Sequence, residues 1–163
     1  MTSAEIARQM IAYSAGNLHD IDHFLKVFAL AQIIGREEKL SEQEQLTLEA
    51  AALVHDIACP LCREKYGNTN GKYQEAEGGP LAREFLRDKG LPAPVTDRVV
   101  FLVSHHHSYT AVDGPDYQIL LEADYLVNAE ESGYSQENIR NTLHTLFKTA
   151  AGTALLKSIY AVS

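Results

Sequence analysis

Apolar residues recur along most of this chain at helical spacing, three or four positions apart, and no segment alternates strictly between apolar and polar residues. The pattern predicts an all-α fold, a single compact bundle of about seven to eight helices. We expect helices over residues 3–14, 19–35, 42–57, 75–89, 95–107, 117–130, 136–149 and 152–160.

Side chains that cap helices support several of these starts. Thr2 and Glu5, like Ser41 and Glu44, have the spacing of a capping box, and Ser135 is a suitable N-cap for a later helix. Residues 59–74, "CPLCREKYGNTNGKYQ", are expected to be irregular, as is the "SYTAVDGPDY" loop. Gly152 is expected to separate the last two helices.

The chain has 163 residues with 45% hydrophobic content, which fits one domain spanning 1–163. Its formal net charge of −8 argues against nucleic acid or an anionic membrane as a partner, because either favours a basic surface. No stretch approaches the roughly 18 apolar residues of a membrane span, and the N-terminus lacks a cleavable signal pattern. We therefore expect a cytoplasmic protein with a small-molecule partner, and the sequence leaves its oligomeric state open.

The chain contains two cysteines, Cys59 and Cys62, in the motif "CPLC". This spacing occurs in redox pairs and in half-sites for zinc, but no second pair of cysteines follows and no thioredoxin-like strand precedes it. Two reduced thiols without a chemical role are the simpler interpretation.

Four predicted helices carry an ionisable residue on their apolar face. His55, for example, continues the apolar stripe of Leu48 and Ala51 at helical spacing. The four residues are His23, His55, His106 and Asp124. One inward histidine or aspartate is commonly a hydrogen-bonded core residue, and a satisfied polar network is therefore one interpretation of the set.

A shared divalent cation explains the set better, because buried charge is costly unless it is paired or coordinates a metal. Asp56 follows His55 directly, and both reach a cation that lies between them. The candidate ligands are thus His23, His55, Asp56 and Asp124.

Three motifs carry a resemblance to a known family: "HDIDHFLKVFALA", "LVHDIA" and "LLEADYL". In this order they resemble the H…HD…D signature of the HD superfamily of metal-dependent phosphohydrolases. "REFL" and "VVFLVSHHH" resemble the helices between those motifs. The resemblance covers about residues 15–130, and it implies an HD-domain bundle on which the helices of 135–160 pack. It selects the same four metal ligands.

The resemblance also bears on the number of ions. Members with two metals carry further histidines between HD and the last aspartate, where this chain has Glu75 and Glu77. We therefore expect one divalent ion (Mn, Fe, Co, Ni, Zn or Mg), because a mixed histidine and carboxylate site accepts all of these. A second ion would use Glu77 opposite His105 or His106.

A cation at such a site lowers the pKa of bound water, which suits hydrolysis of a phosphate ester. The expected substrate is a nucleotide or other small phosphorylated metabolite, with monoesterase and diesterase activity both open. The resemblance implies that Asp56 also orients the attacking water. His105 and His106 are candidates for binding a phosphoryl oxygen or protonating the leaving group, whereas His107 is expected to be exposed at the start of a loop.

Four further residues are candidate substrate contacts. Lys26 matches the family position at which a basic residue faces the site, while Lys72 and Arg83 lie on or after the long loop. Tyr109 is placed to stack on a base or sugar. Each has an ordinary alternative as a solvated cation or a packed tyrosine.

Two alternative functions remain at this point. A non-catalytic sensor would keep the metal and bind a nucleotide without turnover. A di-iron oxygenase of the kind that some HD-fold proteins resemble would need a second metal held by groups such as Glu77 and His106.

Overall fold

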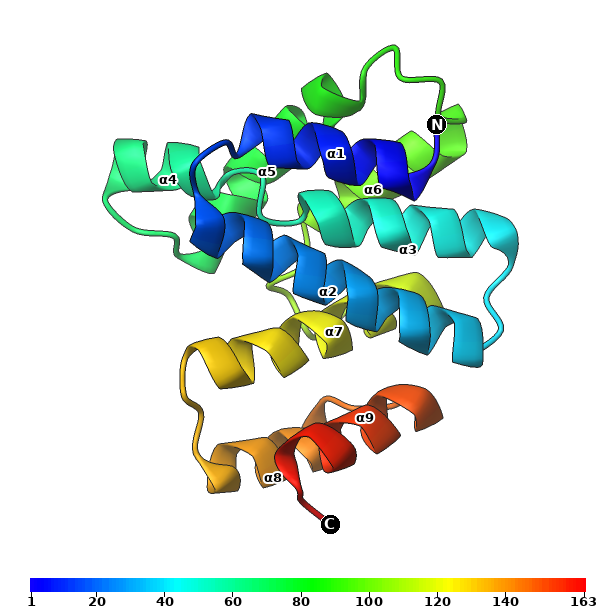
Figure 1. Cartoon of the computed structure of the whole chain (residues 1–163), viewed down its shortest axis with the longest axis vertical. Helices are drawn as coiled ribbons and strands as arrows, with labels where there is room; N and C mark the ends of the chain where they lie inside the picture. The colour runs from blue at the N-terminus through cyan, green and yellow to red at the C-terminus, as the bar shows by residue number, and fades with distance from the viewer.

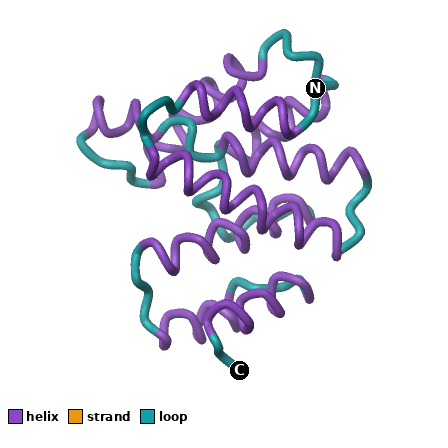
Figure 2. Tube along the Cα trace, in the orientation of Figure 1, coloured by secondary structure: helices purple, strands orange, loops and turns teal.

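Nine helices and no strands make up the chain in the computed structural model, which describes all 163 residues (Figures 1 and 2). The predicted all-α fold is confirmed, with one helix more than expected. The helices are α1 (Ser3–Tyr13), α2 (Leu18–Glu37), α3 (Glu42–Val54), α4 (Cys59–Tyr66), α5 (Gly71–Leu86), α6 (Ala93–Val103), α7 (Pro115–Glu131), α8 (Gln136–Thr145) and α9 (Ala150–Tyr160). None of them has both the length and the apolar content needed to cross a bilayer.

Three helices begin at their predicted caps. In α1 the Thr2 hydroxyl accepts from the Glu5 N–H at 3.3 Å, and the Glu5 carboxylate accepts from the Thr2 N–H at 2.7 Å. α3 begins with the same reciprocal pair, and Ser135 accepts from the Asn138 N–H at the start of α8. Each cap satisfies N–H groups that have no partner within the helix.

The expectation of an irregular segment over 59–74 is wrong at both of its ends. Residues 59–66 form α4, and α5 already begins at Gly71. Pro60 lies in the first turn of α4, where a missing N–H breaks no helical hydrogen bond, and Gly67 ends the helix with a φ of 71°. Gly152 likewise lies inside α9, and the break falls before Ala150.

The core is a single cluster of buried apolar side chains to which every helix except α4 contributes. α2 packs against α3 and α7, α1 against α3, and α3 and α5 against α6. α8 and α9 lie at the opposite end of the molecule from α1, with α9 against α2 and α7 (Figure 1). The predicted apolar stripes face this core, and they bury His23, His55 and Asp124 with them.

Glu122 connects α7 to the start of α9. This carboxylate is fully buried and accepts the backbone N–H groups of Lys148 and Thr149 at 2.7 and 3.0 Å. It also accepts from the Gln118 amide at 2.9 Å and the Thr149 hydroxyl at 2.5 Å. A Cβ at Gly152 would lie 2.1 Å from its Oε2, which is why a glycine fits inside this helix.

We expect Glu122→Ala to lower the free energy of unfolding by about 3 kcal/mol, because several buried donors lose their acceptor. Glu42→Ala is the matched control, since Glu42 is exposed and pairs only with Arg36. Urea unfolding of both variants measures the difference. Equal stability of the two variants would contradict a structural role for Glu122.

Candidate metal centre

The His55–Asp56 pair lies in a turn. α3 ends at Val54 and α4 begins at Cys59, so the helix predicted to reach residue 57 ends sooner. The three consecutive histidines show the same arrangement, because α6 ends at Val103 just before them. A turn frees neighbouring side chains from the divergence of about 100° that a helix imposes, so adjacent residues can face one point.

Hydrogen bonds to helix-end carbonyls fix the orientation of the key imidazoles. The Nδ1 of His55 lies 2.8 Å from the carbonyl oxygen of Ala52, and the Nδ1 of His106 lies 2.8 Å from that of Val103. A carbonyl oxygen only accepts, so the proton is assigned to Nδ1 in both rings. The Nε2 of each neutral ring therefore presents a lone pair to the interior.

The four predicted ligands meet at one point. The Nε2 of His23 lies 3.1 Å from the Nε2 of His55 and 3.2 Å from a carboxylate oxygen of both Asp56 and Asp124. The Nε2 of His55 lies 3.3 Å from Asp124 Oδ1 and 3.4 Å from Asp56 Oδ2. Asp124 Oδ1 is buried and has no hydrogen bond of good geometry despite these short distances.

The carboxylates of this cluster favour a positive charge beside them. Burial opposes protonation of His23, but the close carboxylates of Asp124 and Asp56 outweigh it and raise the pKa of this imidazole to about 11. Burial likewise opposes ionisation of Asp56, yet the neighbouring imidazoles hold its pKa well below the usual value. Converging lone pairs with an orphaned carboxylate oxygen are what a divalent cation requires, so these residues fit a metal.

A second group of potential ligands shares Asp56. Its members are Asp56, His106 and His107, whose ligand atoms lie within 4.8 Å of one another. The Nε2 of His106 is 3.4 Å from Asp56 Oδ1, and both histidines have a buried Nε2 without a hydrogen bond. The expected exposure of His107 is therefore wrong: its ring packs on Gly71, where a Cβ would come within 2.8 Å.

The profile of the HD domain family matches residues 20–129, which hold all four predicted ligands. This chain belongs to the HD domain family. HD domains bind divalent metals, and both groups of side chains described above could hold one. A search of curated proteins found none that matches this chain.

A similar fold occurs in the crystal structure of a protein described as a predicted HD superfamily hydrolase, from an uncultured Thermotogales bacterium. The TM-score is 0.66 and the sequence identity 22%, over 98% of this chain and 83% of the other. The likeness extends the shared fold beyond the matched segment to nearly the whole chain.

The candidate metal centre of this HD domain opens into a cavity of about 180 Å³, called the metal cavity below. Arg63 is its one lysine or arginine, and its guanidinium donates to both carboxylate oxygens of Asp20 at 2.7 Å. The lining residues are His19, Asp20, His23, Asp56, Cys59, Arg63, Thr69, Gln74, His107, Asp124, Asn128, Glu131 and Ser132. Sequence reasoning missed Arg63, although it follows Cys59 at i+4 and thus shares a face of α4.

Two other predicted site residues, Lys26 and Glu77, do not lie where the sequence analysis expected them. Lys26 lies within 3.5 Å of Glu130 and Glu131 rather than on the cavity wall. Glu77 accepts from Lys65 and Tyr66, and it belongs to neither ligand group.

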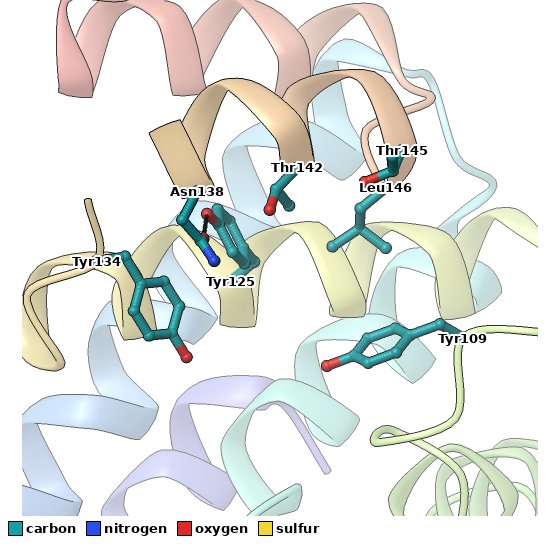
Figure 3. A pocket seen from close by; sticks show the side chains of 7 residues that line it. All are labelled: Tyr109, Tyr125, Tyr134, Asn138, Thr142, Thr145 and Leu146. Atoms are coloured by element: carbon teal, nitrogen blue, oxygen red, sulfur yellow. Dashed lines mark hydrogen bonds between the residues drawn. The ribbon is translucent and has the colours of Figure 1, made fainter. Parts of the chain in front are cut away.

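The remaining candidates lie outside both ligand groups. Arg83 pairs with Asp97 in a separate hollow, and the Lys72 ammonium lies over the Tyr73 ring. His105 stacks on Phe101 and belongs to neither ligand group. Tyr109 is exposed and lines a separate cavity beside α7 and α8 with Tyr125 and Tyr134 (Figure 3).

Glu131 holds the first histidine of the HD domain in place. Its Oε2 lies 2.8 Å from the Nδ1 of His23, so the ring donates from Nδ1 and turns Nε2 toward Asp56 and Asp124. A carboxylate behind a metal-binding histidine fixes its tautomer and raises its basicity. The exposed Lys26 ammonium lies 3.4 Å from the other oxygen of Glu131.

We expect Glu131→Gln to weaken metal affinity by about 10- to 100-fold, because the His23 ring loses its charged partner. Glu130→Gln is the control, since Glu130 is adjacent and exposed and contacts only Lys26. Competition with a chromophoric chelator measures both affinities. Equal affinities in the two variants would contradict an orienting role for Glu131.

Proposed function

We propose that this HD domain is a metal-dependent phosphohydrolase that hydrolyses a phosphate ester of a nucleotide or another small phosphorylated metabolite. The observation that carries the proposal is the convergence of two imidazole nitrogens and two carboxylates on one point, at the wall of a cavity. The Thermotogales protein of similar fold, which is described as a predicted HD superfamily hydrolase, supports this proposal.

The proposed ligands of one divalent ion are His23, His55, Asp56 and Asp124. A bound cation there would acidify water and neutralise charge on a phosphoryl oxygen. Asp56 is the only one of the four with a partly exposed side chain, so it is the carboxylate proposed to accept a proton from the attacking water. His106, whose Nε2 lies 3.4 Å from Asp56, is proposed to donate toward the substrate in its doubly protonated form, since the neutral ring carries its proton on Nδ1. His105 remains a proposed participant.

Arg63 replaces Lys26, Lys72 and Arg83 as the proposed cationic contact of the substrate, because it lines the cavity and they do not. Four carboxylates line the cavity, and the Arg63 side chain beside them is 43% exposed. An arginine recognises phosphate oxygens through paired N–H groups, and Asp20 holds this guanidinium in position. The arrangement gives an anionic substrate one cationic contact besides the metal.

We expect Arg63→Ala to raise KM for a phosphate ester by about tenfold, equivalent to one lost charge-assisted hydrogen bond. Arg87→Ala is the control, because Arg87 is exposed and pairs with Glu84 on α5. Steady-state kinetics on both variants measure the effect. An unchanged KM in Arg63→Ala would remove Arg63 from the substrate contacts.

The group of Asp56, His106 and His107 favours a second candidate, a centre in which these residues would hold a second ion. Two ions suit either phosphoester hydrolysis or the oxygenase alternative. Elemental analysis separates one ion from two, and His107→Ala tests whether the second group is used. Loss of one of two ions in that variant would establish the two-ion centre.

The proposal is tested by reconstituting the metal-free protein separately with each candidate ion and screening a panel of phosphate monoesters and diesters. Turnover that requires a metal and is lost in Asp124→Ala would support the hydrolase. A folded, metal-loaded protein that binds nucleotides without turnover would instead be a sensor. Metal-free protein that cannot be loaded with any of these ions would contradict the metal centre itself.

A further inference from the structure

Gln74 on α5 carries a side-chain carbonyl oxygen that has no partner within the chain. The residue is 5% exposed, and its amide N–H donates to the backbone carbonyl oxygen of Thr69 at 2.7 Å. Because a backbone carbonyl only accepts, this bond fixes which end of the amide is the nitrogen. The other end, Oε1, is buried and accepts no hydrogen bond. An unpaired buried acceptor costs free energy, so Oε1 is an atom that a bound molecule can satisfy.

Gln74 lines the same cavity as three of the proposed metal ligands. The metal cavity has His23, Asp56 and Asp124 on its walls together with Gln74, and its volume is about 180 Å³. In so small a space, a molecule bound at the metal centre lies within reach of Gln74. The volume is below the range of about 300–1,000 Å³ that encloses drug-sized ligands. The metal cavity therefore suits a phosphate with a short alcohol part.

Contacts at the first turn of α5 hold Gln74 next to the histidines that follow α6. Glu75 accepts from the backbone N–H of His107 at 3.1 Å and from the Ser108 hydroxyl at 2.9 Å. The His107 ring packs on Gly71, which precedes Gln74 by three residues and so lies on the same face of α5. These contacts fix the backbone of Gln74 beside the metal centre.

An acceptor in this position distinguishes between the parts of a phosphate ester. Phosphate oxygens carry negative charge at neutral pH and are themselves acceptors, so Gln74 Oε1 disfavours them. An alkyl chain would leave Oε1 unpaired. A hydroxyl or an ammonium group satisfies it, and the alcohol part of an ester can carry either group. The four carboxylates on the walls of the metal cavity favour a donor there as well.

We propose that Gln74 determines part of the substrate specificity of the metal cavity. Its Oε1 accepts a hydrogen bond from a donor near the ester oxygen of the substrate, a hydroxyl or an ammonium group. This donor contact rests on the proposed function, and it selects small polar phosphate esters, such as those of polyols or amino alcohols, among the possible substrates.

The experiment compares three esters with a three-carbon alcohol part on the metal-loaded protein. Propyl phosphate has no donor beside the phosphate, glycerol 3-phosphate has hydroxyls, and 3-aminopropyl phosphate has an ammonium group. The measured quantity is kcat/KM of each polar ester divided by that of propyl phosphate. At least one of the two ratios is expected to exceed about tenfold in the wild type, and the larger one identifies the donor. Two ratios near one would overturn the donor contact, whatever any variant shows.

Gln74→Met keeps the length of the side chain and removes the acceptor, so it is expected to lower the larger ratio about tenfold. Gln43→Met is the matched control, because Gln43 is exposed on α3 and lies outside the metal cavity. Elemental analysis of Gln74→Met is expected to give the metal content of the wild type. Loss of an ion in this variant would overturn the donor contact, because Gln74 would then be a metal ligand.

Phosphonates that cannot be hydrolysed separate the donor contact from the proposed function. Calorimetric titration of the metal-loaded protein compares butylphosphonate with 3,4-dihydroxybutylphosphonate and 4-aminobutylphosphonate, which match the three esters in shape. Turnover with ratios that Gln74→Met leaves unchanged would overturn the donor contact and keep the hydrolase. Absence of turnover, with a preference for one polar phosphonate that Gln74→Met abolishes, would overturn the hydrolase and keep the donor contact. Absence of both turnover and any such preference would overturn both.

Discussion

Asp56→Ala is expected to lower turnover of a phosphate ester by at least about 10³-fold and to leave the protein without stoichiometric metal. Asp56 is the one residue common to both ligand groups, with one oxygen toward His23 and His55 and the other toward His106. A metal supplies several kcal/mol of charge stabilisation, and about 4 kcal/mol corresponds to a 10³-fold change in rate.

Metal content by elemental analysis and turnover of the best ester from the panel measure this effect. Asp22→Ala is the matched control, because Asp22 is exposed on α2 next to His23 and belongs to neither ligand group. Asp56→Asn keeps the shape of the side chain and removes its charge, so it distinguishes ligation from packing. Full turnover and full metal content in Asp56→Ala would contradict the centre described here.

The burial of the predicted ligands could be inferred from the sequence because it depends on residues nearby in the chain. Helical periodicity reports which residues face the core, and His23, His55 and Asp124 occupy positions where the pattern requires apolar residues. The same pattern predicted most helices. It could not show that α3 stops at Val54, because the apolar stripe of α3 continues into the following turn.

Other parts of the site depend on contacts between residues far apart in the sequence, which no local pattern indicates. Arg63 meets Asp20 across 43 residues, and Glu131 meets His23 across 108 residues. Neither pair has a periodic signal, so sequence reasoning alone does not find it. The burial of His107 similarly depends on Gly71 of another helix, which allows the ring to approach the backbone.

The cavity that Tyr109 lines with Tyr125 and Tyr134 is a further feature that the sequence alone does not reveal. Tyr109 could be proposed as a stacking residue from its place after the histidines, but its partners come from α7 and from the α8 region. These segments meet only in the folded chain, where α8 lies alongside the yellow helix α7 (Figures 1 and 3). The cavity is therefore a property of tertiary packing.

Metal affinity of this HD domain is expected to rise with pH, by about tenfold per pH unit for each proton displaced on binding. In the metal-free protein the pKa of His23 is raised to about 11, so its imidazole is protonated at neutral pH. The pKa of His55 is also raised, because the charges of Asp56 and Asp124 outweigh the effect of burial. A cation must displace the proton of His23, and it does so more easily as pH rises.

The free energy of unfolding of the metal-free protein is expected to fall as pH rises. A histidine whose folded-state pKa is raised stabilises the metal-free protein fully below its unfolded pKa of about 6.5, and this contribution is lost as pH rises toward about 11. The metal-free protein therefore loses this stabilisation over the range in which metal affinity increases. At 100-fold excess over Kd the ion adds about 2.7 kcal/mol, which corresponds to roughly 5–10 °C in Tm for a chain of this size.

Calorimetric titrations of the metal-free protein with metal at pH 6.5, 7.5 and 8.5 test the expected rise in metal affinity. Repeating them in buffers with different ionisation enthalpies counts the protons released, and about one or more per ion is expected near neutral pH. Thermal unfolding with and without chelator tests the stabilisation by the ion. The Tm difference between the metal-loaded and the metal-free protein is expected to be larger at pH 8.5 than at pH 6.5. His144→Gln, at an exposed histidine of α8, should keep both dependences. An affinity independent of pH, with no proton released, would mean that His23 is already neutral beside its carboxylates. The charge balance inferred for this centre would then be wrong.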